Sequence, residues 1–340
     1  MAINSIFDAV DHALVHALQL DGRASFRTVA EVLGVSEHTI ARRYRKLRSH
    51  GLLRVVGLLN GPHFGYTSWS VRLVCAPDAA GAVAEALARR DDTVWVRLLS
   101  GGTEIACGVQ TGGDQDGEAL LLKKLPRTPR LVAMSAHATL HMFAGWRSRV
   151  TVLSDEQAER LRPAPAYATE VLLSGQDHAL LRVLAQDGRA GYAELAAASG
   201  WSQTTVRRRL DQLRSSSALR FDVEIPPQAL GYHAEAWLWM KVKPSALASV
   251  GAALATHPEA DVVAATTGPT NLMAGVTCRD TQDLYRYITE RVAPLDGVRE
   301  VTPPLPEESG FSLPSAEVGD GQALTVSNKG TVTGKRFPCR

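Results

Sequence analysis

The chain has 340 residues, of which 45% are hydrophobic and 21% are charged, and this composition is typical of a globular protein with roughly two or three domains. The formal net charge is only +2, so a contact with a polyanion must come from a local basic patch. No apolar run reaches the ~18 residues of a membrane span, and the N-terminus lacks the basic start of a secretory signal. We therefore expect a cytoplasmic protein with no membrane partner.

The four cysteines, Cys75, Cys107, Cys278 and Cys339, show no C-x-x-C spacing. Three of them lie in apolar runs, where cysteine usually packs as a small buried hydrophobe. His12 and His16 are four residues apart on a predicted helix, but no third ligand follows at a suitable spacing, so we interpret both as surface residues. The sequence therefore predicts neither a metal site nor a cofactor.

Three helices are predicted at the start of the chain. The first covers Asp11–Gln19, and Asp21–Ala24 (DGRA) ends it. A shorter second helix closes with Ala30 and Leu33. Gly34 then supplies the positive φ that a tight turn between helices requires. A short helix, a glycine turn and a third helix form the pattern of a helix-turn-helix.

The third helix, Ser36–Ser49, carries one apolar stripe and one basic face. Ser36 is placed to accept a hydrogen bond from a free backbone N–H in the first turn. The stripe consists of Ile40, Tyr44 and Leu47, and the polar face of His38, Thr39, Arg42, Arg45, Lys46 and Ser49. Such a helix either presents a solvated face to water or enters the major groove of DNA. The glycine turn, the N-cap and the repetition described below favour DNA.

After a β-rich run at Leu52–Asn60, typical of a wing or connecting strand, the periodicity changes. Six elements are predicted in the order β-α-β-β-α-β, which is the ferredoxin-like arrangement: Ser68–Cys75, Ala79–Arg90, Thr93–Leu99, Glu104–Val109, Glu118–Leu125 and Leu131–Met142. A segment with two prolines follows and is interpreted as a linker containing one helix at Asp155–Leu161.

The whole pattern then recurs. Asp11–Arg54 and Asp177–Arg220 align without a gap and share 20 of 44 residues, including the turn glycine, the cap serine and the arginine pair of the third helix. The second set of sheet elements is Ala236–Val242, Ser245–Thr256, Asp261–Thr266, Asn271–Cys278, Thr281–Ala293 and Val298–Thr302. The rest of the chain is rich in Gly, Pro, Ser and Glu and is expected to form a mobile tail.

These elements predict an α+β fold, in which two helix-turn-helix (winged-helix-like) domains alternate with two ferredoxin-like βαββαβ domains. The expected boundaries are 1–62 and 174–230 for the helix-turn-helix domains, 63–143 and 231–305 for the ferredoxin-like domains, 144–173 for the linker and 306–340 for the tail.

At about Asp11–Phe143, and again at Asp177–Pro303, the sequence resembles the Lrp/AsnC (feast/famine) family of transcriptional regulators. The resemblance rests on the DGRA turn, the Gly-x-Ser cap, the arginine pair of the third helix and the βαββαβ layout that follows. It implies a sequence-specific regulator that binds double-stranded DNA and assembles from pseudo-dimers into a homo-oligomer. It also implies an amino-acid-like effector at the hairpin that ends the second strand, where the matching positions are Gly101, Glu104, Gly268 and Asn271.

The predicted DNA-contacting residues belong to the third helix of each copy: Ser36, His38, Thr39, Arg42, Arg43, Arg45, Lys46, Ser202, Thr204, Thr205, Arg207, Arg208 and Arg209. The two helices differ, because Asp211 and Gln212 replace Arg45 and Lys46. Arginine and lysine contacts to phosphate supply much of the affinity for DNA. We therefore expect the first copy to dominate binding.

Two alternatives remain open. Some proteins that resemble this family are tetrapyrrole (sirohaem) decarboxylases, and His137 and His141 on one strand face, with Arg147 and Arg149 nearby, could hold an acidic tetrapyrrole. The other alternative is a helix-turn-helix that contacts only protein. A decarboxylase would not need the basic face of the third helix, so we predict a regulator that is not an enzyme.

Overall fold

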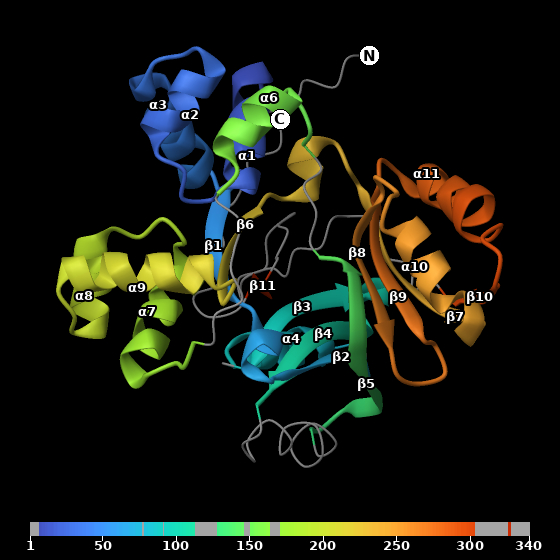
Figure 1. Cartoon of the computed structure of the whole chain (residues 1–340). Coiled ribbons are helices and arrows are strands. Elements are labelled where there is room, and N and C mark those ends of the chain that lie inside the picture. Colours follow the sequence, from blue (N-terminus) through green and yellow to red (C-terminus); the bar gives the residue numbers. More distant parts are fainter. Residues whose placement is uncertain are drawn as a thin grey trace. The chain divides into compact units, whose positions relative to one another are not determined.

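The computed structural model describes residues 7–76, 78–90, 92–112, 128–145, 150–163, 171–302 and 326–327. It divides into two compact units (Figure 1), each of which combines a part of the first half of the chain with a part of the second half. The helical unit contains residues 1–65 and 150–230, and the sheet unit contains residues 66–149 and 231–340. None of the described helices has both the length and the apolar character needed to cross a membrane.

The helical unit contains the two helix-turn-helix modules. The first module consists of α1 (Ala9–Leu20), α2 (Phe26–Leu33), α3 (Glu37–Ser49), β1 (Arg54–Leu59) and the 3-10 turn η1 (Gly61–Phe64). The second consists of α7 (Gly175–Gln186), α8 (Tyr192–Ser199), α9 (Gln203–Ser215), β6 (Leu219–Glu224) and the 3-10 turn η5 (Pro227–Leu230). The duplicated sequence thus folds into duplicated elements.

The signals that begin α3 and α9 are those predicted from the sequence. The Ser36 hydroxyl accepts a hydrogen bond from the Thr39 backbone N–H at 3.1 Å, and Ser202 accepts one from Thr205 at 3.1 Å. The turns before the two helices contain Gly34 and Gly200 with φ values of +67° and +74°. The apolar stripe of each helix is buried, namely Ile40, Tyr44 and Leu47 in α3 and Val206, Leu210 and Leu213 in α9.

Helix α9 ends on a residue that is conformationally unusual. Gly51 follows α3 with φ +68°, and Ser217 holds the equivalent place after α9 with φ +61°. A left-handed conformation is free of steric cost for glycine and unfavourable for a residue with a Cβ atom. The second copy therefore keeps the geometry of the helix stop at some cost in stability.

His16 is buried, with a side chain that serves the fold, so the prediction that it lies on the surface was wrong. Its Nδ1 accepts hydrogen bonds from the backbone N–H groups of Val152 and Leu153 at 3.1 and 3.0 Å. These residues lead into α6 (Asp155–Leu161), the helix predicted within the linker, which packs against α1 and α2. The linker segment is thus partly built into the first module.

Strands β1 and β6 join the two modules. They pair antiparallel in a two-stranded ribbon, with a register that runs from Arg54 opposite Glu224 to Leu59 opposite Leu219. Figure 1 shows the two strands side by side between the modules. The run predicted as a wing or connecting strand is therefore a connection between the two copies.

The elements that the structure describes in the sheet unit follow the predicted order. Its first half has β2 (Thr67–Cys75), α4 (Ala80–Ala88), β3 (Thr93–Leu99), the turn η2 (Ser100–Gly102), β4 (Glu104–Thr111) and β5 (Leu131–Ala144). Its second half has β7 (Ala234–Val242), η6 (Pro244–Ala246), α10 (Leu247–Leu254), β8 (Ala260–Thr266), β9 (Leu272–Cys278), α11 (Thr281–Arg286), the π-helix η7 (Tyr287–Val292) and β10 (Val298–Thr302). The helix predicted at Glu118–Leu125 lies outside the described residues, as does the tail apart from β11 (Val326–Ser327).

The strands described in this unit form one nine-stranded sheet in the order β10-β7-β9-β8-β5-β2-β4-β3-β11. The two halves meet where β5 pairs antiparallel with β8. Each half has its own apolar core, and a further cluster joins residues of both, in which Trp95 of β3 stacks on Trp237 of β7 with 4.5 Å between ring centroids. Cys75, Cys107 and Cys278 are buried, as predicted.

Candidate nucleic-acid interface

Helix α3 presents a continuous basic surface. His38, Arg42, Arg45 and Lys46 are all exposed, on the side of the helix opposite its buried stripe. The Arg45 Nε donates only to the carbonyl of Ala41 in the same helix, at 3.3 Å. These side chains are thus available to an external partner.

Arg43 does not belong to this exposed face. Its Nη1 contacts Asp8 Oδ2 at 2.6 Å and Asp11 Oδ1 at 2.9 Å, and its side chain is 22% exposed. Asp8 and Asp11 form the capping box of α1. Burial tends to raise the pKa of Asp8, but the backbone of Asp11 and the Arg43 guanidinium lower it below its ordinary value. Arg43 therefore fixes α3 to the start of α1.

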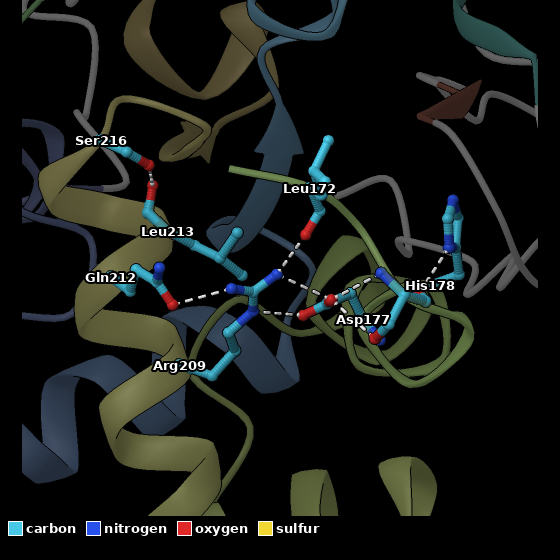
Figure 2. Close-up of polar contacts among 8 residues, drawn as sticks. Leu172, Asp177, His178, Arg209, Gln212, Leu213 and Ser216 are labelled. Atoms are coloured by element: carbon cyan, nitrogen blue, oxygen red, sulfur yellow. Dashed lines mark hydrogen bonds and ion pairs between the residues drawn. The ribbon is translucent and has the colours of Figure 1, made fainter. Parts of the chain in front are cut away.

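Arg209 makes the equivalent ion pair in α9, and it has more hydrogen-bond partners than Arg43 (Figure 2). Its Nε donates to Asp177 Oδ1 at 2.7 Å, and its Nη2 donates to Asp177 Oδ2 at 2.9 Å and to the Leu172 carbonyl at 2.6 Å. Its Nη1 donates to Gln212 at 2.7 Å. The Asp177 side chain is only 1% exposed and also accepts from Ser174.

The electrostatics of this pair explain how a carboxylate can be charged while buried. Burial raises the pKa of Asp177, but hydrogen bonds from Arg209 and Ser174 outweigh it and place the pKa below the ordinary value. Asp177 is therefore ionised at neutral pH. Both members of the pair recur at the same spacing in the two copies, and this repeated Asp–Arg spacing was the sequence signal that could have separated Arg43 and Arg209 from the exposed arginines.

The exposed surface of α9 is less basic than that of α3. Thr204 and Arg208 are exposed, and Arg207 lies with its guanidinium carbon 5.0 Å from the centre of the Tyr192 ring. Asp211, which replaces Arg45, is exposed as well. Thr39 and Thr205 are half-buried, with hydroxyls hydrogen-bonded to the cap serines at 2.8 and 2.9 Å. The two candidate reading helices thus differ in charge while sharing the same backbone arrangement.

The two hairpins considered for an effector also differ. In the first, Glu104 accepts a bidentate pair of hydrogen bonds from Arg72, at 3.0 and 2.9 Å. In the second, the Asn271 amide makes two hydrogen bonds with the backbone of Val242, at 2.8 and 2.9 Å. Gly101 lies in the turn η2 that leads to Glu104. Gly268 has φ +100° and lies so close to His137 that a Cβ atom would clash with its ring.

The comparisons with known proteins agree with this arrangement. Two stretches, 7–48 and 173–214, match the AsnC-type helix-turn-helix domain, and residues 235–302 match the Lrp/AsnC ligand binding domain. The chain is 36% identical over 135 residues to an uncharacterized HTH-type transcriptional regulator of Pyrococcus abyssi, covering 39% of this chain and 85% of that protein. It is 27% identical over 133 residues to the HTH-type transcriptional regulator LrpA of Pyrococcus horikoshii, covering 39% of this chain and 94% of that one.

Among solved structures, the fold is similar to that of the siroheme decarboxylase NirDL. The TM-score is 0.59 at 12% sequence identity, and the match covers 88% of this chain and 91% of NirDL. NirDL was also solved with an iron-uroporphyrin III analogue, and that structure gives a TM-score of 0.58. At this identity the likeness concerns the fold, and it extends over both copies of the unit.

Proposed function

This chain belongs to the Lrp/AsnC family of transcriptional regulators, in a tandem-duplicated form, and on that premise we propose that it binds specific DNA as an intrachain pseudo-dimer. The observation that carries the proposal is the exposed basic face of α3, made by Arg42, Arg45 and Lys46 on a capped helix that follows a glycine turn. A second helix of the same construction, α9, lies in the same compact unit. Two such helices suit a DNA site with two half-sites.

In the proposed mechanism, affinity and specificity come from different residues. Arg45 and Lys46 contact phosphates, which attract the protein without reading sequence. His38, Thr39 and Arg42, near the start of α3, contact base edges in the major groove. Ser36 and Ser202 act through the N-caps that begin the two helices. Arg43 and Arg209 hold the helices in place through their ion pairs with α1 and α7.

The second copy contributes less to affinity. Thr204, Thr205, Arg207 and Arg208 lie at its reading end, but Asp211 adds a negative charge where α3 has Arg45. A carboxylate close to a DNA phosphate opposes binding. We therefore expect the two half-sites to differ in sequence and the first module to supply most of the free energy of binding.

We also propose an amino-acid effector site at the first hairpin alone. A free amino acid carries one carboxylate and one ammonium group, and it could exchange with the Glu104–Arg72 pair by placing its carboxylate on Arg72 and its ammonium on Glu104. In the second copy Trp239 holds the position equivalent to Arg72, and Asn271 is engaged with the backbone. Association of several pseudo-dimers into a homo-oligomer is a further expectation from the family.

The experiment that tests DNA binding is selection from random DNA followed by nuclease footprinting of the selected fragments. We expect two protected half-sites about one helical turn, or a multiple of it, apart. Substituting Arg42 and Arg208 separately by Ala distinguishes the two modules. The loss of affinity should be larger for Arg42→Ala, and a larger loss for Arg208→Ala would show that the modules have been ranked in the wrong order.

A tetrapyrrole decarboxylase is the second candidate, because the fold of NirDL matches nearly the whole chain. Of the residues considered for that activity, His137 packs against Gly268 and His141 makes an edge contact with Phe143. Arg147 and Arg149 lie outside the described residues. Titration with an iron tetrapyrrole separates the two functions: a shifted Soret band with decarboxylation of the added compound would support the enzyme, and an unchanged spectrum would support the regulator.

A further inference from the structure

Four arginines connect the two helix-turn-helix modules through contacts that are repeated in each direction. The first two are Arg23 and Arg189, which follow Gly22 and Gly188 in the DGRA turns. Arg23 donates from Nη1 to the Gly188 carbonyl at 2.6 Å and from Nη2 to the Ala190 carbonyl at 3.1 Å. Arg189 donates in the same way to the carbonyls of Gly22 and Ala24, at 2.7 and 2.9 Å. The arginine of each turn therefore donates hydrogen bonds to the backbone of the other copy's turn.

Aromatic side chains complete these contacts. The guanidinium of Arg189 lies 4.5 Å from the centre of the Phe26 ring and 5.4 Å from that of Tyr44. Arg23 lies 5.5 Å from the ring centre of Tyr192. Cation–π contacts of this kind add stabilisation where the guanidinium is removed from water. Tyr44 belongs to the buried stripe of α3, so the turn of the second module reaches the reading helix of the first.

The other two arginines tie the end of each reading helix to the opposite turn. Arg48, in the last turn of α3, contacts Asp187 at 2.7 Å, and Arg214, in the last turn of α9, contacts Asp21 at 2.8 Å. The same aspartates also shape their own turns, because Asp21 accepts from the Arg23 backbone and Asp187 from the Arg189 backbone, both at 2.9 Å. These backbone hydrogen bonds hold the Asp21 and Asp187 carboxylates in the orientation in which they contact Arg214 and Arg48.

The turns have no room for larger residues. A Cβ atom on Gly22 would lie 2.7 Å from the Cβ of Phe221 and 2.9 Å from a methyl group of Val55. One on Gly188 would lie 3.0 Å from Phe221 and from the backbone of Val56. The DGRA turns therefore pack directly on the β1–β6 ribbon, which adds a hydrogen-bonded ladder to the arginine contacts.

We propose that Arg23, Arg189, Arg48 and Arg214, called here the arginine latch, fix the separation and orientation of α3 and α9 and thereby set the half-site spacing that the protein reads. The DNA contacts proposed above for α3 and α9 use none of these four arginines. They are positioning residues, and their effect reaches the DNA through the geometry of the two reading helices. A rigid pair of readers binds well only when the second half-site lies at the right distance and on the right face of the duplex.

The spacing part of this inference rests on the proposed function, whereas the rigidity part is measurable without DNA. Spin labels on Glu37→Cys and Gln203→Cys, which are exposed and begin α3 and α9, report the distance between the two helices. Cys339 is replaced by Ser in this background, and the buried cysteines stay. The native latch should give one narrow distance distribution, and Arg23→Ala with Arg189→Ala should at least double its width.

Two further variants make the measurement decisive. Arg48→Ala with Arg214→Ala removes the two ion pairs, whose arginine side chains are 50% and 28% exposed, together with the contact of Arg214 to the Phe221 ring at 5.7 Å, and it should also widen the distribution. Arg27→Ala is the matched control, because Arg27 is 79% exposed and forms its ion pair with Glu31 in its own helix, at 3.0 Å. Circular dichroism confirms that each variant is folded. An unchanged width in the folded Arg48/Arg214 variant, or equal widening by Arg27→Ala, would overturn the proposal.

The DNA arm then separates this inference from the proposed function. On fragments that carry the selected half-sites at varied spacing, the native chain should lose about tenfold in affinity when the spacing changes by half a turn, because the second reader then faces away from its half-site. The Arg48/Arg214 variant should lose about threefold or less. If the native chain and the Arg48/Arg214 variant show the same dependence of affinity on spacing, the latch is contradicted. If no DNA can be selected but the Arg48/Arg214 variant still widens the distance distribution, only the proposed function is contradicted.

Discussion

Replacing Arg209 should destabilise the protein far more than replacing its neighbour Arg208, because Arg209 pairs with the buried Asp177 and Arg208 is exposed. Arg209→Ala removes the counter-charge of the Asp177 carboxylate, which is 1% exposed in the native structure, and leaves it the two hydrogen bonds from Ser174. Removing one partner of a buried pair usually costs about 3–5 kcal/mol. Because Arg209 is itself 18% exposed and Ser174 remains, we expect the lower end, about 3 kcal/mol. Arg208→Ala, one residue away and exposed, should change stability by less than about 0.5 kcal/mol.

The assay needs a signal from this module alone, and the sequence provides one. Trp201 is the single tryptophan in residues 1–65 and 150–230, and it packs against the core of the second module. With fluorinated tryptophan, its resonance can be followed during urea unfolding. At an m-value of about 2 kcal/mol/M, a loss of 3 kcal/mol lowers the midpoint by about 1.5 M.

A further variant tests the stated cause. Replacing both partners, as in Asp177→Asn with Arg209→Met, removes the buried charge together with its counter-charge and should recover much of the loss. Equal midpoints for Arg209→Ala and Arg208→Ala would refute the reasoning. So would a double variant that is as unstable as Arg209→Ala.

Three other predictions follow from single residues. Ser217→Gly should raise the free energy of unfolding of the second module by about 0.5–1 kcal/mol in urea, because φ +61° favours glycine; no gain would argue against strain there. Burial lowers the pKa of His16, so the native state binds its proton less well than the unfolded chain. The stability that His16 contributes is therefore present above pH 6.5 and falls as the pH drops below it. The free energy of unfolding should decline less steeply between pH 7.5 and 5 in His16→Gln than in the native chain, by at most about 1.4 kcal/mol per pH unit. Parallel curves for the two proteins would contradict this. Calorimetry should find at most one amino-acid site per chain, abolished by Glu104→Gln, and two sites would contradict the assignment to the first hairpin.

Local signals in the sequence predicted much of this fold correctly. Ser36, Gly34 and the stripe Ile40, Tyr44 and Leu47 act through neighbours within one or two helical turns, so their effect can be read from spacing alone. The repeat of these signals at Ser202 and Gly200 predicted the second module.

Contacts between segments distant in the sequence could not be predicted in this way. His16 lies on a helix with ordinary amphipathic spacing, and only the folded chain brings Val152 and Leu153 to its ring. Arg23 reaches the carbonyl of Gly188, far along the chain. Of the adjacent arginines on α9, Arg209 is half-buried and Arg208 is exposed, because their side chains leave the helix about 100° apart.

The most direct test of the central claim is the binding of the purified chain to its selected DNA fragment across a salt series, with excess non-specific competitor present. A reader that neutralises several phosphates should bind in the presence of competitor, and the logarithm of the binding constant should fall linearly with the logarithm of the salt concentration, with a slope of about −0.9 for each phosphate contacted. Arg45→Ala should make this slope shallower by about one. Binding that competitor abolishes at every salt concentration would contradict a sequence-specific regulator.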